Sequence, residues 1–189
     1  TARRLGEKWF SDVKPGRRAE PMTIPGVALA DVQRKTTTDR VQLPRFTIAW
    51  LTPRHFAPGD AALDVVADVL AGGRNSRLYK RLVYDMQIAQ EVSAFQVSMS
   101  LTSYFQVEAT PRPGHTVEEL LKVIDEEIAT LQRELPTERE VQRAINKVEA
   151  SYFNRMERVG GFGGKADLLN AYLSETGIPD WFNEDLARY

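Results

Sequence analysis

Two Thr-x-x-Glu sequences set the strongest constraint on the fold, because each opens a long segment with apolar residues at helical spacing. Thr116 and Glu119 begin the first segment, and Thr137 and Glu140 begin the second. In such a capping box the threonine hydroxyl and the glutamate carboxylate bind free backbone N–H groups at the start of a helix. The sequence therefore predicts two consecutive long helices, the second running to about Met156. The residues expected to be buried are Leu120, Leu121, Ile124, Ile128 and Leu131 in the first, and Val141, Ile145, Val148 and Tyr152 in the second.

Strand patterns precede these helices. Residues 32–38 are rich in threonine, and residues 45–51 (RFTIAWL) form a nearly continuous apolar run that predicts a buried strand. Residues 91–99 and 103–109 alternate apolar and polar side chains, and Ser100–Thr102 is the expected turn between them. Four strands are therefore predicted, the last two as an antiparallel hairpin.

Shorter helices are predicted from the spacing of apolar residues and from residues typical of helix starts. Asp60 lies at the start of one that reaches Leu70, and Ser76 is the expected cap of another that ends near Met86, with Leu78, Leu82 and Met86 inward. Residues 165–173 and 180–189 give two more. The element order predicts an α+β fold, with an antiparallel sheet layered with helices.

Domain boundaries are predicted from the N-terminal third of the chain. Residues 1–13 begin with an amphipathic helix over 2–10, as expected for the last helix of a preceding domain. Residues 14–31 contain Pro15, Pro21 and Pro25 and favour an extended linker. The remaining residues, 32–189, form the main domain, which we expect to be truncated at its end.

Composition excludes several classes of function. The 189 residues fit one domain, and their formal net charge of −1 gives no field that would attract nucleic acid. No apolar stretch approaches the roughly 20 residues needed to cross a bilayer, so membrane insertion is not expected. The chain has no cysteine, which excludes disulfides, thiol nucleophiles and thiolate metal sites.

No catalytic or metal-binding constellation is evident in the sequence. His55 and His115 lack a second histidine at helical spacing and are expected to be solvated. The carboxylates of the long helices, including Glu127 and Glu140, are interpreted as solvated faces. Two glycine-rich segments, AGGRNSR and RVGGFGG, are interpreted as a helix stop followed by a cap and as a hinge. We therefore predict no catalytic residue and no metal ligand here.

Several segments together resemble a known family. PRFTIAWLTP, a helix ending in LAGG, SRLYKRLVYDMQIAQEVSA and LLNAYLSETGIPDWFNE are similar to the second domain of pitrilysin-type zinc metallopeptidases, a family that includes insulin-degrading enzyme and the mitochondrial processing peptidase. The similarity extends from about residue 30 onward, and residues 76–79 (SRLY) are its most specific part.

The resemblance implies a clamshell of two homologous halves. One half carries an H-x-x-E-H motif that binds zinc, and the other, to which this chain is similar, encloses the peptide substrate. Expected partners are an N-terminal zinc-bearing domain of the same chain, a peptide substrate and a homologous subunit. Zinc is expected in the parent protein and not in this chain.

Active members of the family also place an Arg and a Tyr, seven residues apart, against the substrate. Alignment puts Val83 and Gln90 at these positions, so both depart from the pattern. Arg81 and Tyr84 lie nearby, and Arg77 has the right separation from Tyr84 in the wrong register. Arg81, Tyr84 and Gln90 are the candidate substrate-binding residues.

Two other interpretations stay open. The chain could be a non-catalytic structural or assembly subunit of the same fold, or a helix-rich scaffold whose likeness to the family is limited to the fold. The resemblance also suggests the periplasm or cell envelope of a bacterium, although no residue specifies a compartment.

Overall fold

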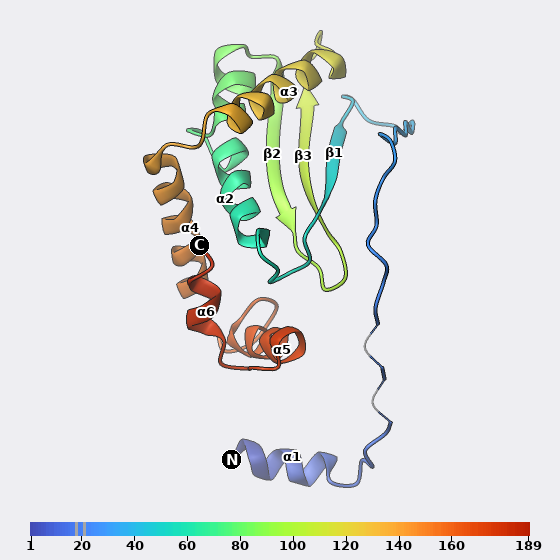
Figure 1. The fold of residues 1–189 in the computed structure, drawn as a ribbon, viewed down its shortest axis with the longest axis vertical. Coiled ribbons are helices and arrows are strands. Elements are labelled where there is room, and N and C mark those ends of the chain that lie inside the picture. Colours follow the sequence, from blue (N-terminus) through green and yellow to red (C-terminus); the bar gives the residue numbers. More distant parts are fainter. Residues whose placement is uncertain (18, 21) are drawn as a thin grey trace.

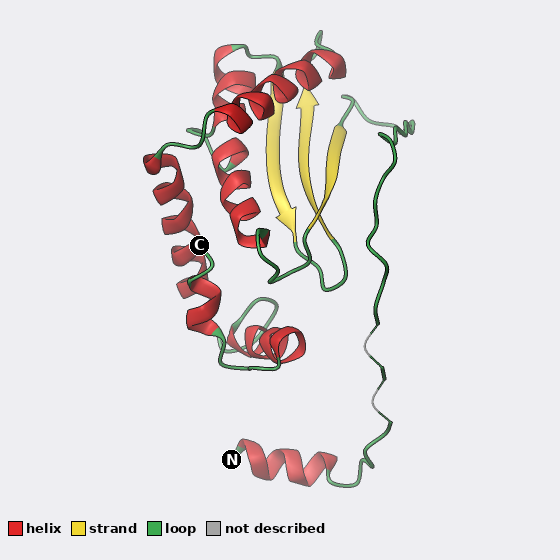
Figure 2. Ribbon diagram, in the orientation of Figure 1, coloured by secondary structure: helices red, strands yellow, loops and turns green. Residues whose placement is uncertain are grey.

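The computed structural model describes residues 1–17, 19–20 and 22–189 and has an α+β architecture (Figures 1 and 2). A sheet of three antiparallel strands is layered with helices, as predicted. In chain order the elements are α1 (Ala2–Phe10), β1 (Phe46–Thr52), α2 (Asp60–Ala71), the π-helix η1 (Tyr79–Asp85), β2 (Ala89–Val97), β3 (Ser103–Pro111), α3 (Val117–Arg133), α4 (Glu138–Glu157), α5 (Lys165–Thr176) and α6 (Phe182–Leu186).

The sheet has the strand order β1-β3-β2, so the last strand in the sequence is central. Val107 of β3 lies between Ile48 of β1 and Ala94 of β2 in the antiparallel register. Val107 is fully buried, because these rows of side chains pack against α2, η1 and α3. Alternate strand residues thus form one wall of the core.

Both predicted capping boxes are confirmed. The Thr116 hydroxyl accepts from the Glu119 N–H at the start of α3, and Thr137 and Glu140 make the same pair of contacts at α4. Leu120 and Ile124 of α3 are fully buried, as expected. Of the residues predicted inward on α4, only Tyr152 is buried, because α4 packs beside α2 and away from the sheet.

The N-terminal part of the chain contributes no buried residue among those described from 1 to 45. The predicted helix α1 is confirmed, and Figure 1 shows it far from the sheet. The strand predicted over residues 32–38 is wrong, because this segment pairs with no other strand. Pro21, one of the prolines on which the linker prediction rests, lies outside the described residues.

Strand β1 differs from its prediction in burial. Trp50 is 39% and Leu51 42% exposed, although the apolar run predicts a buried strand. The reason is that β1 is an edge strand, and within it Phe46 and Ile48 are the residues that pack against the core. Leu51 points to the opposite face, because neighbouring strand residues alternate.

The helix predicted from Ser76 exists but winds differently. Residues 79–85 form a π-helix, in which the Met86 N–H donates to Arg81 O at 2.9 Å across five residues. Ser76 does not cap it, because its hydroxyl donates backward to Gly73 O at 2.5 Å. Leu82 is buried as predicted, whereas Met86 is 46% exposed and the inward position predicted for it is wrong.

The C-terminal helices fold back beside α4 and the start of α2 (Figure 1). The glycine-rich segment between α4 and α5 is closed by backbone bonds from Lys165 N to Arg158 O and from Ala166 N to Val159 O. Gly177 ends α5 in the left-handed region, at φ 78°. These turns bring the last residues of the chain against α2.

Candidate functional site

The three predicted substrate-binding residues lie around η1 and the start of β2. Their side chains differ in exposure and in whether they form ion pairs. Tyr84 is 73% exposed, and Gln90 is exposed at an irregularity in the pairing of β2 with β3, between Ala89 and Glu91. Such bulges re-aim a side chain out of the regular pleat. Arg81 is held by ion pairs to Glu126 and, at 3.5 Å, to Glu127.

Val83 and Arg77, at and near the position of the family's arginine, are committed to other contacts. Val83, in the place of the expected arginine, packs against the hydrophobic core. Arg77 is bound to Glu140 by two hydrogen bonds of 2.8 and 2.9 Å, and it lies 3.9 Å from Glu127. Because its guanidinium is committed to these carboxylates, Arg77 does not form a surface pair with Tyr84.

The interpretation of all helix carboxylates as solvated is wrong for Glu127 and Glu140. Their side chains are only 13% and 18% exposed, because both turn inward onto Arg77. The hydrogen bonds from Arg77, assisted by those from Thr137, lower the pKa of Glu140 to about 2. These contacts join the segment just before η1 to α3 and α4.

The histidines lie in separate environments. His55 is partly buried and stacks on Phe56 at a ring distance of 3.6 Å, so the expectation of a solvated side chain is wrong for it. Burial lowers its pKa. His115 contacts Glu119 at 3.2 Å at the start of α3. No group of three or more His, Asp or Glu side chains in the described part of the chain could hold a metal ion, so these residues do not fit zinc.

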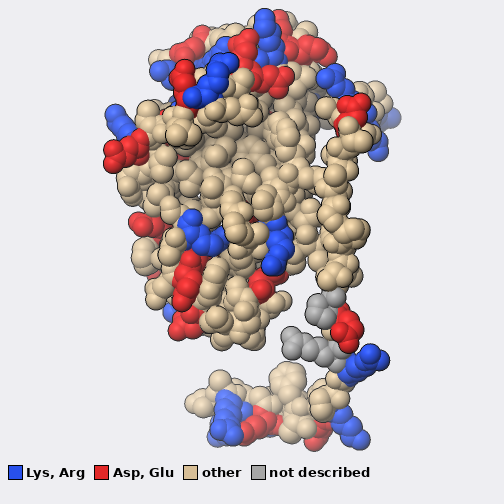
Figure 3. Space-filling view, viewed as in Figure 1, with Lys and Arg blue, Asp and Glu red and all other residues tan. Residues whose placement is uncertain are grey.

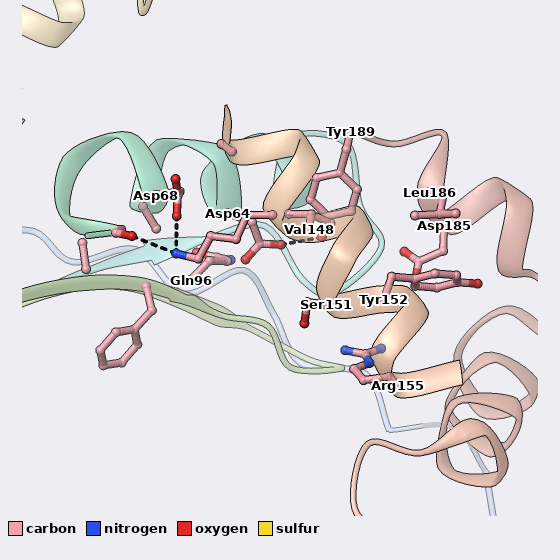
Figure 4. A pocket seen from close by; sticks show the side chains of 16 residues that line it. Asp64, Asp68, Gln96, Val148, Ser151, Tyr152, Arg155, Asp185, Leu186 and Tyr189 are labelled. Atoms are coloured by element: carbon pink, nitrogen blue, oxygen red, sulfur yellow. Dashed lines mark hydrogen bonds and ion pairs between the residues drawn. The ribbon is translucent and has the colours of Figure 1, made fainter. Parts of the chain in front are cut away.

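A groove of about 370 Å³ runs between α2, β2, α4 and the C-terminal segment (Figure 4). Its size lies within the usual range for ligand sites of roughly 300–1,000 Å³. Strand β2 contributes the consecutive residues Ala94, Phe95 and Gln96. Helix α4 contributes a polar stripe of Lys147, Ser151 and Arg155. We call this the α4–β2 groove.

The acidic residues of the groove already have partners. Asp68 binds Lys147 Nζ at 2.5 Å, and Asp64 accepts a hydrogen bond of 2.7 Å from the Tyr189 hydroxyl. Burial raises the pKa of Asp64 despite that bond. Arg155 differs, because its Nε is buried and has no hydrogen-bond partner among the described residues.

A charged network closes one end of the groove. Arg188 donates to Asp185 at 2.6 Å and to Asp60 at 3.1 Å, and Asp185 also accepts from the buried Tyr172 hydroxyl at 2.6 Å. The Arg188 guanidinium lies 4.7 Å from the centre of the Phe56 ring. This network fixes the C-terminal segment that forms part of the groove wall.

The sequence analysis did not identify the groove or this network. A signal was present in α4, because Lys147, Ser151 and Arg155 are four residues apart and therefore share one helix face. No local pattern joins Arg188 to Asp60, since that contact depends on how the helices fold back.

Surface charge is unevenly distributed over the face shown in Figure 3. Charged side chains gather at the upper end, over α3, and again toward the lower end, with a broad area of few charges between. Among the described helices, none is long and apolar enough to cross a membrane.

Comparison with known proteins gives one family match, to the peptidase M16 inactive domain over residues 1–148. No curated protein matches the chain. A match of this length contradicts the interpretation as a scaffold with only a fold-level likeness.

Solved structures share the fold at low sequence identity. A protease from Helicobacter pylori is 20% identical with a TM-score of 0.70, over 80% of this chain and 36% of that one. A protein from Bordetella pertussis described as a zinc protease is 21% identical with a TM-score of 0.66, over 80% of this chain and 81% of that one. A chain of complex III2 from Candida albicans is 16% identical with a TM-score of 0.61, over 78% of this chain and 37% of that one. The chain thus spans about a third of the Helicobacter pylori protease.

Proposed function

Because this chain belongs to the family of the peptidase M16 inactive domain, we propose that it is the non-catalytic half of a zinc-dependent metalloendopeptidase. It encloses a peptide substrate and holds it against a zinc site on an N-terminal domain of the same polypeptide. The observation that carries this proposal is the family match over residues 1–148. The described residues offer no zinc site of their own, so zinc chemistry is assigned to the partner domain.

The domain organisation follows from this role. Residues 1–13 are the last helix of the preceding domain, residues 14–31 are the linker, and residues 32–189 are the inactive peptidase-like domain. The exposure of Leu5, Trp9 and Phe10 on α1 supports this division, because an apolar helix face requires a protein surface to cover it.

Substrate contacts are assigned to Arg81, Tyr84 and Gln90. The exposure of Tyr84 and the bulged position of Gln90 leave both side chains free to bind a peptide. Arg81 is 36% exposed and is held in place by Glu126 and Glu127, so it can offer its remaining donors from a fixed position.

The test compares the chain with the longer polypeptide that joins it to the zinc-bearing domain. The longer protein should cleave an unstructured fluorogenic peptide and lose that activity when a chelator removes zinc. The purified chain should not cleave the peptide, with or without added zinc. Chelator-sensitive cleavage by the chain alone would contradict the proposal.

A second candidate is a structural or assembly subunit with no proteolytic role. The likeness to a chain of complex III2 from Candida albicans supports it, because the same fold occurs there within a large assembly. The coding sequence upstream of Thr1 separates the candidates. An H-x-x-E-H motif there favours the peptidase, and its absence favours the assembly subunit.

A further inference from the structure

The α4–β2 groove meets the backbone edge of a strand. Ala94, Phe95 and Gln96 all line it, although neighbouring residues of a strand point to opposite faces of the sheet. A groove that is lined by all three therefore reaches the main chain of β2.

This edge has unused hydrogen-bonding capacity. In the sheet order β1-β3-β2, strand β2 pairs with β3 alone among the described residues. Every second backbone N–H and C=O of an edge strand points away from its partner. An extended peptide can add to such an edge as a further strand.

Helix α4 forms the wall of the groove opposite β2 and contributes two positively charged side chains, Lys147 and Arg155. Lys147 is committed to Asp68 and to Gly72 O, at 2.5 and 2.9 Å. Among the described residues Arg155 forms no ion pair, and its Nε has no hydrogen-bond partner. Because Arg155 lines the groove, a ligand carboxylate there can pair with the accessible part of its guanidinium.

The dimensions fit a short strand. Lys147 and Arg155 are eight residues apart on α4, which corresponds to about 12 Å of helix. Roughly four residues of an extended peptide cover the same length. Ser151 lies between them and adds a hydroxyl to the same face.

We propose that the α4–β2 groove binds an extended peptide that pairs with the free edge of β2 and places an acidic side chain against Arg155. The inference rests on the proposed function for its ligand class, because it states where and how a peptide is held. It differs from the contacts assigned to Arg81, Tyr84 and Gln90, because its residues come from α4 and the middle of β2.

The experiment measures peptide binding to the purified chain by fluorescence polarisation. The probe is a short, end-capped, labelled peptide of valine and threonine with one central glutamate. Two further versions carry N-methyl groups on alternate residues, in the two possible phases, and a third replaces glutamate with glutamine. The protein variants are Arg155→Gln and, as a matched control at the end of the same helix, Arg158→Gln.

The glutamate peptide should bind the unmodified chain, and Arg155→Gln should weaken it by about tenfold or more. The glutamine peptide should lose the same affinity and show no further loss on Arg155→Gln. One phase of N-methylation should abolish binding, because it blocks the N–H groups that face β2. Arg158→Gln should leave the affinity unchanged.

The inference is overturned by no binding to the unmodified chain, by equal loss in both variants, or by full binding of both N-methylated peptides. Self-association that Arg155→Gln abolishes would assign the groove to a second copy and also overturn it. If peptide binding persists undiminished in Arg155→Gln, the groove is wrong while the proposed function stands. The cleavage assay with chelator decides the proposed function separately.

Discussion

Arg188 lies 3.1 Å from Asp60, although the two residues are 128 positions apart in the sequence. Asp60 is 1% exposed and also accepts hydrogen bonds from Ser98 and Gln96 at 2.6 and 3.2 Å. This contact connects the first turn of α2, the end of β2 and the C-terminus. It therefore fixes the part of the chain that closes the α4–β2 groove.

Replacing Asp60 with alanine should strongly destabilise the fold, because it leaves the half-buried Arg188 with one carboxylate fewer. Breaking a buried ion pair from one side costs about 3–5 kcal/mol. Urea unfolding monitored by circular dichroism measures the loss. Asp39→Ala is the control, since Asp39 is exposed and its described contact is with the next residue, Arg40. Equal stability of the two variants would contradict the role of Asp60.

Protonation of Glu140 should make the fold sensitive to acid. The Arg77 pair lowers the pKa of Glu140 from 4.5 to about 2. A depressed folded-state pKa adds stability above the unfolded value, and that stability is lost as the pH falls from about 4.5 toward 2. The contribution at pH 7 is about 3 kcal/mol at most.

Glu140→Gln should therefore lower the free energy of unfolding at pH 7 and flatten its pH dependence between about 4.5 and 2. Glu149→Gln, an exposed change on the same helix, should keep the wild-type slope. Parallel pH profiles for wild type and Glu140→Gln would show that the Arg77 pair does not persist in solution.

Tyr84→Ala and Gln90→Ala test the assigned substrate contacts. Both side chains are exposed, so each change should alter stability by no more than about 0.5 kcal/mol. The affinity of the chain for the unstructured fluorogenic peptide should fall about fivefold in each variant, equivalent to ~1 kcal/mol. Leu135→Ala, at a position 84% exposed between α3 and α4, should leave affinity unchanged. Unaltered binding in both variants would remove these residues from the peptide contact.

Gly177→Ala tests the turn after α5. Gly177 has φ 78°, and its N–H donates to Leu173 O at 3.1 Å. A residue with a Cβ pays about 1–2 kcal/mol in this left-handed conformation. Gly6→Ala is the matched control, because Gly6 lies in the exposed helix α1 with open space around it. Thermal unfolding should detect the first change and not the second.

Local patterns were sufficient to predict most of the secondary structure. The capping boxes at Thr116 and Thr137 fixed the starts of α3 and α4, because the caps use residues within one helical turn. Hydrophobic alternation predicted the β2–β3 hairpin for the same reason. The strand predicted for the threonine-rich residues 32–38 is wrong, because a strand requires a partner and these residues pair with no strand.

The candidate sites depended on tertiary structure to different degrees. Arg81, Tyr84 and Gln90 were chosen by alignment with the family's Arg-Tyr pattern, and their role in substrate binding stays a prediction. It could not predict that Arg77 would turn inward onto Glu127 and Glu140, because those carboxylates come from two other helices.

The amino-acid sequence by itself determined the helices, the hairpin and the family, because each is specified by residues close together in the chain. Only the tertiary structure decided the strand order, the exposed edge of β2 and the contact between Asp60 and Arg188. These features depend on which surfaces meet when the core is buried, and no short stretch of sequence contains that information.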